Sequence, residues 1–254
     1  MENRQKVAII VNNDMAKSIF NPADYHFLTE FADVNPLDEL PEQITADDMY
    51  RLLPGAAACI TCWGTPSFTD NLLDDMKSLR LIAHAAGSVK NLVPESFWSR
   101  TCRITSNAPI IAEDVAQTTL ALILGSLKQL WGFSMHTHKG QWSGGEAARF
   151  TTRRLEGLQV GVVGASHVGR EVIRLLRPFG CSICLSDPYT SPLEAAALGV
   201  RLIELDELIA TSDVLTLHTP ANPDCVHLIS AQNAPLIKDG ACWVPTASPK
   251  FTII

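Results

Sequence analysis

Short β-branched and apolar runs alternate along the chain with segments whose apolar residues recur at helical spacing. Runs of the first kind predict strands at residues 7–11, 58–62, 80–86, 103–107, 159–164, 182–187, 214–220 and 241–246. Helix starts lie between them, with Asn21-Pro22 opening one helical segment and Thr45 opening another. Because strands separated by helices are joined by crossovers, the pattern predicts an α/β fold with parallel sheets.

One long segment, residues 111–130, is apolar on nearly every face, which predicts a helix buried between layers or between subunits. Its uncharged part, residues 115–127, contains Gln, Thr and Ser and is shorter than the ~20 apolar residues of a bilayer span. Residues 131–157 lose the periodicity and gain Gly, Ser and charge. We therefore expect a connection there, leading to a second unit that starts near Leu158.

Composition narrows the class of protein. The chain has 254 residues, 46% hydrophobic and 19% charged, which excludes a disordered protein and allows one large domain or two modest ones. The formal net charge of -7 argues against nucleic acid or an anionic membrane as the main partner and favours a small molecule. The N-terminal apolar run, residues 7–11, is too short for a signal peptide, so we expect a cytoplasmic protein.

Two C-x-x-C pairs, at residues 59–62 and 181–184, raise the question of a metal site. Both pairs lie in apolar runs that look like strands, where positions i and i+3 point to opposite faces, so buried free thiols are expected instead. The odd count of seven cysteines argues against a disulfide framework. His136 and His138 have no third ligand nearby and fit a solvated helix end, so no metal is predicted.

The segment Gly164-Ala-Ser166-His-Val-Gly169 follows a buried strand and precedes a helical pattern. A dinucleotide pyrophosphate is bound by backbone N–H groups at a helix start, and the G-x-G-x-x-G motif places glycines where phosphate and chain approach closely. Gly164 and Gly169 hold the first and third positions. Ser166 holds the second, where its hydroxyl can donate to phosphate while its Cβ restricts the approach.

Asp187 ends the next predicted strand, 18 residues after Gly169 (187 - 169 = 18). The motif expects an acid about 20 residues on, hydrogen-bonded to the adenosine ribose hydroxyls. A carboxylate at this place repels a 2′-phosphate, and no arginine follows before Arg201. The sequence therefore predicts NAD rather than NADP as cofactor.

With Asp187-Pro188-Tyr189 in place, the chain resembles the D-isomer-specific 2-hydroxyacid dehydrogenases over nearly its whole length. The segments that carry the resemblance are AAGSVKNLVP (85–94), SNAPIIAEDVAQTTLALIL (106–124), KGQW (139–142), LEGLQVGVVG (155–164), SDVLTLHTPANPDCVHLIS (212–230) and LIKDGA (236–241). The resemblance implies two Rossmann-like or flavodoxin-like domains with a cleft between them. They are a substrate domain at residues 1–105 and an NAD-binding domain at residues 106–254, which begins with the long helix.

The resemblance also implies a reaction and the residues that serve it. A hydride passes between NAD(H) and a 2-hydroxy or 2-keto acid, in a homodimer. Backbone amides of Gly87, Ser88 and Val89 would hold the substrate carboxylate, while Trp63 stands where many relatives have an Arg, which favours a neutral or apolar substituent. The implied cofactor contacts are Ser166, His167, Val168 and Gly169 with Gly164 for the pyrophosphate, Asp187 for the ribose, His218, Thr219 and Pro220 along the cleft, Val115 and Thr119 facing the nicotinamide, and Pro188, Tyr189 and Thr246 as further contacts.

The chain departs from the family pattern after residue 244. Relatives read N-T-A-R-G, and their Arg binds the substrate and stabilises charge on its oxygen, but here Pro245 replaces the Asn and Ser248 replaces the Arg. Serine offers neither a cation nor a bidentate fork, and the family's later Glu and His, its acid-base pair, have no counterpart. We therefore expect a C-terminally truncated member without intact catalytic residues, with weakened NAD binding and negligible turnover.

Two other hypotheses stay open. The same fold can serve as a non-catalytic, NAD-responsive binding or scaffold protein, although the sheet edge and apolar faces exposed by a truncation argue against a well-behaved short chain. A complete enzyme of different chemistry could use Ser248 or a cysteine as nucleophile, but no adjacent base can be named for it.

Overall fold

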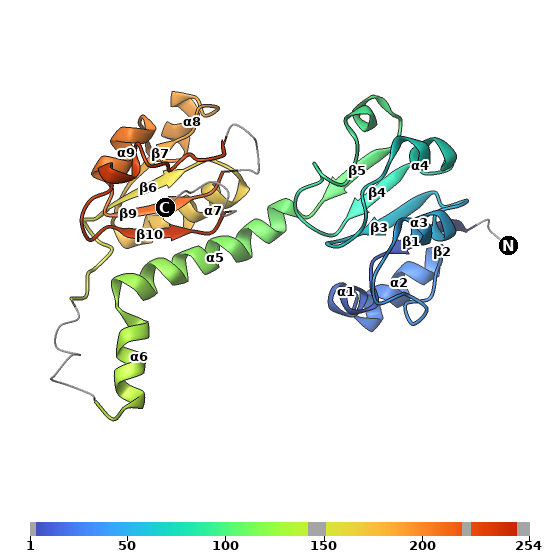
Figure 1. The fold of residues 1–254 in the computed structure, drawn as a ribbon, viewed down its shortest axis with the longest axis horizontal. Helices are drawn as coiled ribbons and strands as arrows, with labels where there is room; N and C mark the ends of the chain where they lie inside the picture. The colour runs from blue at the N-terminus through green and yellow to red at the C-terminus, as the bar shows by residue number, and fades with distance from the viewer. Residues whose placement is uncertain (1–3, 142–150, 220–224, 248–254) are drawn as a thin grey trace. The chain divides into compact units, whose positions relative to one another are not determined.

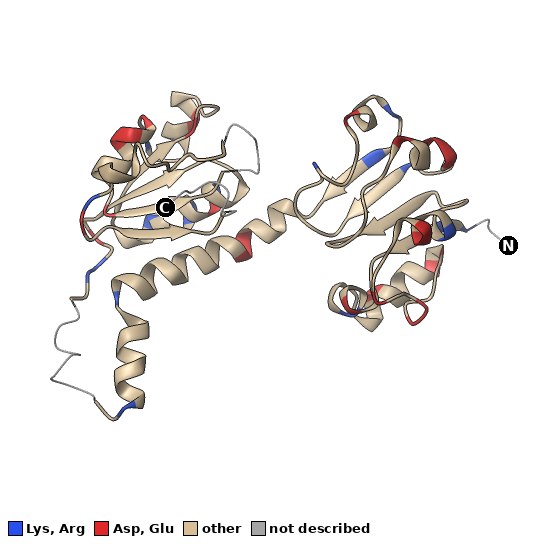
Figure 2. Cartoon of the chain, in the orientation of Figure 1, with Lys and Arg blue, Asp and Glu red and all other residues tan. Residues whose placement is uncertain are grey.

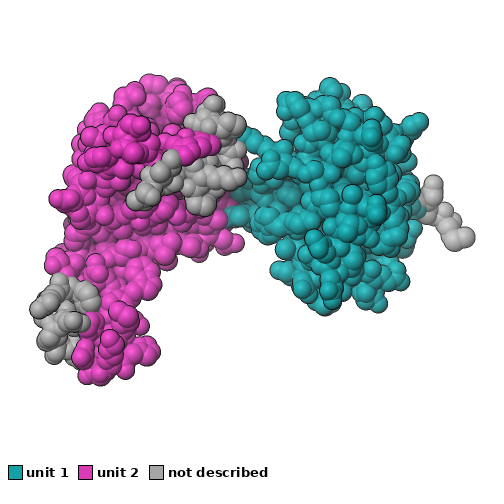
Figure 3. Space-filling view, in the orientation of Figure 1, with its two compact units in different colours: residues 1–111 teal, residues 112–254 magenta. Residues whose placement is uncertain are grey.

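The computed structural model describes residues 4–141, 151–219 and 225–247. The chain divides into two compact units, residues 1–111 and 112–254 (Figure 3). Each unit contains a five-stranded parallel sheet covered by helices (Figure 1). The predicted α/β class with two parallel-sheet units is confirmed.

The first unit has the strand order β2-β1-β3-β4-β5. Its elements are β1 (Gln5–Ile10), α1 (Asn13–Ile19), α2 (Pro22–Phe31), β2 (Ala32–Val34), α3 (Ala46–Leu52), β3 (Ala58–Thr61), α4 (Asp70–Asp75), β4 (Leu81–His84), η1 (Glu95–Ser99) and β5 (Arg103–Ser106). Both predicted helix starts are confirmed: Asn21 caps α2, and Thr45 forms a capping box with Asp48 at the start of α3. Residues of the central strands contribute to two core clusters, one packed against α3 and α4 and the other against α1 and α2.

The second unit has the strand order β10-β9-β6-β7-β8. Its elements are α5 (Ala108–Leu127), α6 (Leu130–His138), β6 (Gln159–Val163), α7 (His167–Leu176), η3 (Arg177–Phe179), β7 (Ser182–Ser186), α8 (Pro192–Ala197), β8 (Arg201–Leu202), α9 (Leu205–Thr211), β9 (Val214–Leu217), η5 (Ala234–Leu236) and β10 (Cys242–Pro245). Buried residues of α5 and α7 pack with one core cluster of this sheet, and those of α9 pack with a second. The carboxyl ends of β6, β7, β9 and β10 meet at one edge because the strands are parallel.

All eight predicted strands are present, and the sequence missed two. The missed strands, β2 and β8, contain three and two residues and pair at the outer positions of their sheets. Elements this short have too few positions to show the alternation from which a strand is predicted.

The long helix is only partly buried within the chain. Within the chain, α5 buries one stripe, formed by Ala112, Ala116, Thr119, Ile123 and Leu127. Gly125 is buried on another face, and Leu122 is 36% exposed. Other faces of α5 are therefore not covered within one chain, and the burial of those faces between subunits stays a prediction. At 20 residues α5 is also long and apolar enough to cross a membrane by length and composition, although Ala116, Ile123 and Leu127 belong to a core cluster of the second unit.

The start of the expected connection is helical. Residues after Gln129 form α6, and Gln129 itself, at φ 55°, separates this helix from α5. The ring of Trp131 folds over Gly125, where a Cβ would lie 2.7 Å from the indole. The small residue in α5 thus makes room for the first turn of α6, a contact that periodicity does not reveal.

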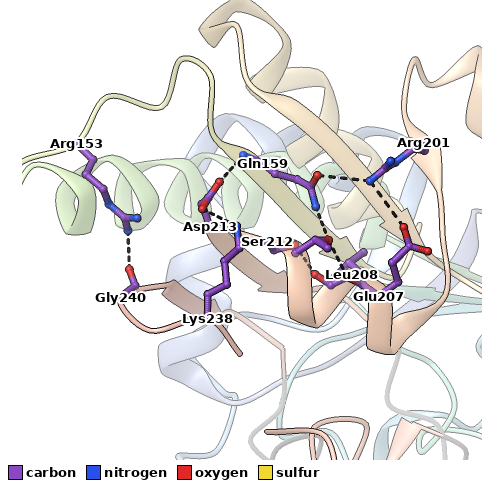
Figure 4. Close-up of polar contacts among 10 residues, drawn as sticks. Arg153, Gln159, Arg201, Glu207, Leu208, Ser212, Asp213, Lys238 and Gly240 are labelled. Carbon is purple, nitrogen blue, oxygen red and sulfur yellow. Dashed lines mark hydrogen bonds and ion pairs between the residues drawn. The ribbon is translucent and has the colours of Figure 1, made fainter. Parts of the chain in front are cut away.

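The amino edge of the second sheet is tied together by polar contacts (Figure 4). One oxygen of Asp213 accepts from the backbone amide of Gln159 at 2.9 Å, and the other pairs with the Lys238 ammonium at 2.9 Å. Arg153 donates to the Gly240 carbonyl at 2.8 Å. These contacts connect the starts of β6, β9 and β10 and so fix the positions of the strands whose other ends carry the site.

Candidate functional site

The loop between β6 and α7 lies at the carboxyl edge of the second sheet. Gly164 has φ +93°, a conformation that side chains other than glycine rarely adopt. Ser166 is the N-cap of α7: its Oγ accepts from the Gly169 amide at 3.3 Å, so its hydroxyl proton stays available to another acceptor. The amides of His167 and Val168 have no acceptor among the residues that the structure describes. Two amides and a hydroxyl thus converge as donors suited to an anion.

Asp187, the predicted ribose ligand, follows β7 and is tied to the same loop. Its Oδ2 accepts from the Ala165 amide at 2.6 Å, and its Oδ1 accepts from the Tyr189 amide at 2.8 Å. Pro188 and Tyr189 are exposed beside it. Because each carboxylate oxygen accepts more than one hydrogen bond, the backbone holds Asp187 in place while capacity for ligand hydroxyls remains.

A cavity of about 570 Å³ lies beside Asp187. It extends from the ends of β6 and β7 to residues 202–205 and Leu228. Apolar side chains line much of it, with the Asp187 and Glu204 carboxylates as charged groups, which is the usual character of a small-molecule pocket. Sequence reasoning missed Glu204 and Leu228, because neither belongs to a motif with fixed spacing.

Three observations test whether a dinucleotide fits this edge. The Thr219 hydroxyl, which also lines the cavity, is buried without a partner in the described structure. A Cβ on Gly164 would lie 3.0 Å from the His218 carbonyl carbon, and one on Gly169 would lie 2.0 Å from the Gly164 oxygen. An unsatisfied buried hydroxyl and a loop that only glycines allow to pack this closely fit a bound pyrophosphate.

His218 is buried after β9 and forms part of a chain of hydroxyls. Its Nε2 contacts Thr216 Oγ1 at 2.9 Å, and its Nδ1 contacts Thr246 Oγ1 at 3.3 Å. Thr246 in turn contacts Thr119 Oγ1 at 3.0 Å. The structure therefore brings together three of the predicted cofactor residues, and Val115 joins them because its carbonyl accepts from the Thr119 hydroxyl at 2.8 Å. Burial lowers the pKa of His218 to about 4.

In the first unit, Gly87, Ser88 and Val89 form the turn after β4. Their three amides have no acceptor within the described parts of the chain. Successive free amides of this kind form an anion-binding concavity. Trp63 follows the neighbouring strand β3 and is 55% exposed. Trp63 and the turn thus lie at the same edge of the first sheet, because β3 and β4 are parallel.

Beneath this edge a buried histidine contacts a threonine. Nδ1 of His84 lies 3.0 Å from the hydroxyl of Thr61, its partner across the β3–β4 pair. Burial lowers the pKa of His84, which matches the expected satisfied core histidine. Neither His84 nor His218 is hydrogen-bonded to a carboxylate in these contacts.

Two of the predicted site residues, Pro220 and Ser248, lie outside the described residues. Cys59 and Cys62 of the first C-x-x-C pair are buried, and burial raises the pKa of both thiols. Groups of three or more His, Cys, Asp or Glu side chains able to hold a metal ion do not occur among the described residues. Thr216 was missed by the sequence, since a lone threonine in a strand carries no signal.

Comparison with protein families assigns the chain to a known family. Residues 120–250 match the family described as "D-isomer specific 2-hydroxyacid dehydrogenase, NAD binding domain", which is just over half of the chain. The chain therefore belongs to the D-isomer-specific 2-hydroxyacid dehydrogenase family, and its cofactor is NAD, as predicted. Its second unit carries the NAD-binding domain of that family.

Individual relatives resemble the chain at moderate identity. It is 27% identical over 211 residues to D-3-phosphoglycerate dehydrogenase of Methanocaldococcus jannaschii, covering 82% of this chain and 39% of that protein. It is 24% identical to hydroxypyruvate reductase of Thermotoga maritima, covering 83% and 67%. The crystal structure of a glyoxylate reductase from Paecilomyes thermophila has the same fold, with a TM-score of 0.78 at 21% identity over 98% of this chain and 75% of that one. The chain thus spans about two fifths of the length of the phosphoglycerate dehydrogenases that it matches.

Proposed function

We propose that this protein is of the NAD-dependent oxidoreductase type whose reaction passes a hydride between NAD(H) and a small 2-hydroxy or 2-keto acid, and that this chain keeps the NAD-binding function without that reaction. The observation that carries the proposal is the phosphate loop itself. The amides of His167 and Val168 lack acceptors, and the loop is tied to Asp187 through the Ala165 amide. Together with the family membership of residues 120–250, this arrangement supports a dinucleotide at the carboxyl edge of the second sheet.

Different groups of residues contact different parts of the cofactor. The loop of Gly164, Ser166, His167, Val168 and Gly169 binds the pyrophosphate, and Asp187 accepts from the ribose hydroxyls, with Pro188 and Tyr189 beside the adenosine. Thr219 lies after β9, and Pro220 is proposed as a further contact from its place in the sequence. His218, Thr246, Thr119 and Val115 hold the nicotinamide. When bound, NAD supplies the carbon that gives or takes the hydride.

The turn of the first unit supplies the substrate contacts. We infer that the amides of Gly87, Ser88 and Val89 donate to the carboxylate of a 2-hydroxy or 2-keto acid. Trp63, exposed at the same edge, presents an indole where an arginine would select an anionic substituent. This combination favours substrates whose tail is neutral or apolar.

Turnover by the 254-residue chain is expected to be negligible. Ser248 takes the place of the arginine that stabilises charge on the substrate oxygen, and the buried histidines His84 and His218 contact threonines. The test is to measure NADH oxidation by the purified chain with glyoxylate, pyruvate and hydroxypyruvate, alongside NADH binding by fluorescence. Binding without oxidation is the expected result. Measurable oxidation contradicts the inactivity, and failure to bind NADH contradicts the proposed function as a whole.

A second candidate function, an NAD-responsive binding protein, is favoured by one observation. Apolar side chains are exposed on α6, with Leu130 at 56%, Trp131 at 55% and Met135 at 60%, and on α5, with Leu122 at 36%. Charges are sparse along both helices (Figure 2). Such a surface fits a homodimer or another protein partner. Light scattering with and without NAD distinguishes the candidates, because a scaffold requires that association change with the cofactor, whereas the enzyme's dimer is indifferent to it.

A further inference from the structure

Arg170 lies in α7 directly after Gly169, and its side chain turns back toward the start of the helix. Its Nε donates to the carbonyl of Ala165, five residues earlier, at 2.9 Å. Side chains on a helix tilt toward its N-terminus, which brings the guanidinium of an early helical residue within reach of the preceding loop. Within the part of the chain that the structure describes, no other donor reaches the Ala165 carbonyl.

Ala165 is also held through its amide. Oδ2 of Asp187 accepts from this amide at 2.6 Å. The amide belongs to the peptide that joins Gly164 to Ala165, whereas the carbonyl belongs to the peptide that joins Ala165 to Ser166. Because both peptides are trans and planar, the two hydrogen bonds fix two successive peptide planes of the loop.

The peptide that Arg170 holds leads directly into α7. In a planar trans peptide the carbonyl points away from the N–H group of the next residue. A carbonyl turned toward Arg170 therefore sets the direction of the Ser166 amide and of the helical turn that follows it. That turn contains the amides of His167 and Val168, which have no acceptor among the described residues.

The outer end of the guanidinium faces α8, where it makes a weaker contact. Nη2 of Arg170 lies 3.8 Å from Oε1 of Glu194, whose other oxygen accepts from the Ser191 amide and hydroxyl, each at 2.8 Å. The side chains of Arg170 and Glu194 are 43% and 51% exposed, and an ion pair this exposed contributes little to stability. The contact that gives the Arg170 side chain a defined role is therefore the one to Ala165.

We propose that Arg170 is a positioning residue, whose Nε holds the Ala165 carbonyl so that the amides at the start of α7 face the pyrophosphate of the cofactor. The role belongs to the N–H donor at the Nε position and not to the positive charge. The inference rests on the proposed binding of NAD at this edge. When the carbonyl is released, the peptide between Ala165 and Ser166 can turn, and ordering it again on binding lowers the affinity.

Two substitutions separate the donor from the charge. In Arg170→Gln, the side-chain nitrogen Nε2 stands at the same place along the side chain as the arginine Nε, so the donor is kept and the charge is lost. In Arg170→Lys, a carbon stands at that place, so the charge is kept and the donor is lost. Dissociation constants are measured by NMR titration for ADP-ribose, which carries the pyrophosphate, and for adenosine, which carries no phosphate.

Arg170→Lys should bind ADP-ribose about tenfold more weakly than the wild-type protein, whereas Arg170→Gln should stay within about threefold of it. Adenosine should bind both variants as it binds the wild type, because Asp187 and the cavity are unchanged. The reverse order, with Lys retained and Gln impaired, would mean that the charge acts on the phosphates directly and would overturn the proposal. An equal loss in the two variants, or no loss in either, contradicts it as well.

Glu194→Gln is the matched control. It removes the charge that faces Arg170 and keeps an acceptor for Ser191, so both affinities should stay at the wild-type values. Weaker binding of ADP-ribose by this variant would assign the role of Arg170 to its pair with α8, against the proposal.

Adenosine also reports whether each variant is folded. A loss confined to ADP-ribose is an effect on the loop, while a loss of both ligands in Arg170→Lys would mean that Arg170 serves the fold, which overturns the positioning role. If the wild-type protein does not bind ADP-ribose, the proposed function fails and this inference fails with it. The outcomes in the variants bear on Arg170 alone.

Discussion

The two edges of the second sheet, where its strands begin and where they end, differ in how far their polar groups are paired. At the amino edge, Asp213 uses both oxygens, on Gln159 and Lys238, and Arg153 reaches the Gly240 carbonyl (Figure 4). At the carboxyl edge, the Thr219 hydroxyl and the backbone amides of His167 and Val168 have no partner within the described structure. A buried polar group without a hydrogen-bond partner lowers the stability of the fold. We therefore infer that the unpaired groups at the carboxyl edge find their partners in a bound ligand.

The two edges should therefore affect different quantities. Loss of a contact at the amino edge should lower the free energy of unfolding and leave the affinity for the cofactor nearly unchanged. Loss of a group at the carboxyl edge should lower the affinity for the cofactor and leave the free energy of unfolding nearly unchanged, except where packing itself forms the loop.

The largest expected effect comes from that exception. In Gly169→Ala the new Cβ would lie 2.0 Å from the Gly164 oxygen, so α7 must shift away from the loop. We expect a loss of more than about 3 kcal/mol in the free energy of unfolding, measured in urea, together with loss of NADH binding. Gly87→Ala, at a glycine with open space around it, is the control and should change stability by less than about 0.5 kcal/mol. Similar stabilities for the two variants would break the link between the glycine and the loop.

The next effect is a dependence of stability on pH. Burial lowers the pKa of His218 to about 4 in the folded state, against about 6.5 in the unfolded chain. Between these values the unfolded state binds more protons, so stability is full above about pH 6.5 and falls by about 3 kcal/mol as the pH drops to about 4. Urea unfolding across this range measures the loss. In His218→Gln the slope should decrease to the part that His84 and other groups contribute, and an unchanged slope would place the effect elsewhere.

At the amino edge, Asp213→Ala removes the acceptor of the Gln159 amide and the partner of Lys238. We expect a loss of about 2 kcal/mol in the free energy of unfolding, since a half-buried donor and a cation lose their partner. Asp213→Asn, which keeps an acceptor for Gln159, should lose about half as much. The Kd for NADH should stay within twofold of wild type in both variants, and a larger change would show that the two edges are coupled.

The smallest expected effect on stability comes from a substitution at the carboxyl edge. Thr219→Val replaces the unpartnered hydroxyl with a methyl group of similar size. Stability should not decrease, because no internal hydrogen bond is lost, while the Kd for NADH should rise about fivefold to tenfold. Fluorescence titration and urea unfolding on the same preparation measure both quantities. A loss of stability without a change in Kd would mean that the hydroxyl serves the fold and not the ligand.

Much of the fold was predictable because its signals are local. Eight strands were predicted from runs of five to seven residues, whereas β2 and β8 are too short to carry that signal. Helix α6 was missed because its residues lack periodicity and it is set by the packing of Trp131 on Gly125. The sequence of α5 did not indicate which of its faces the chain itself covers, because a uniformly apolar helix shows no preferred face.

For the site, the sequence alone predicted the phosphate loop and Asp187, because a strand, a glycine-bearing turn, a helix and an acid at fixed spacing are read from neighbouring residues. Only the tertiary structure decided that Asp187 accepts from the Ala165 amide, and that Thr119, Thr216, His218 and Thr246 form one hydrogen-bonded chain. Those residues come from α5, β9 and the ends of two strands, up to 127 positions apart. Their contacts depend on the pairing of β9 with β10 and the packing of α5, which local patterns do not specify.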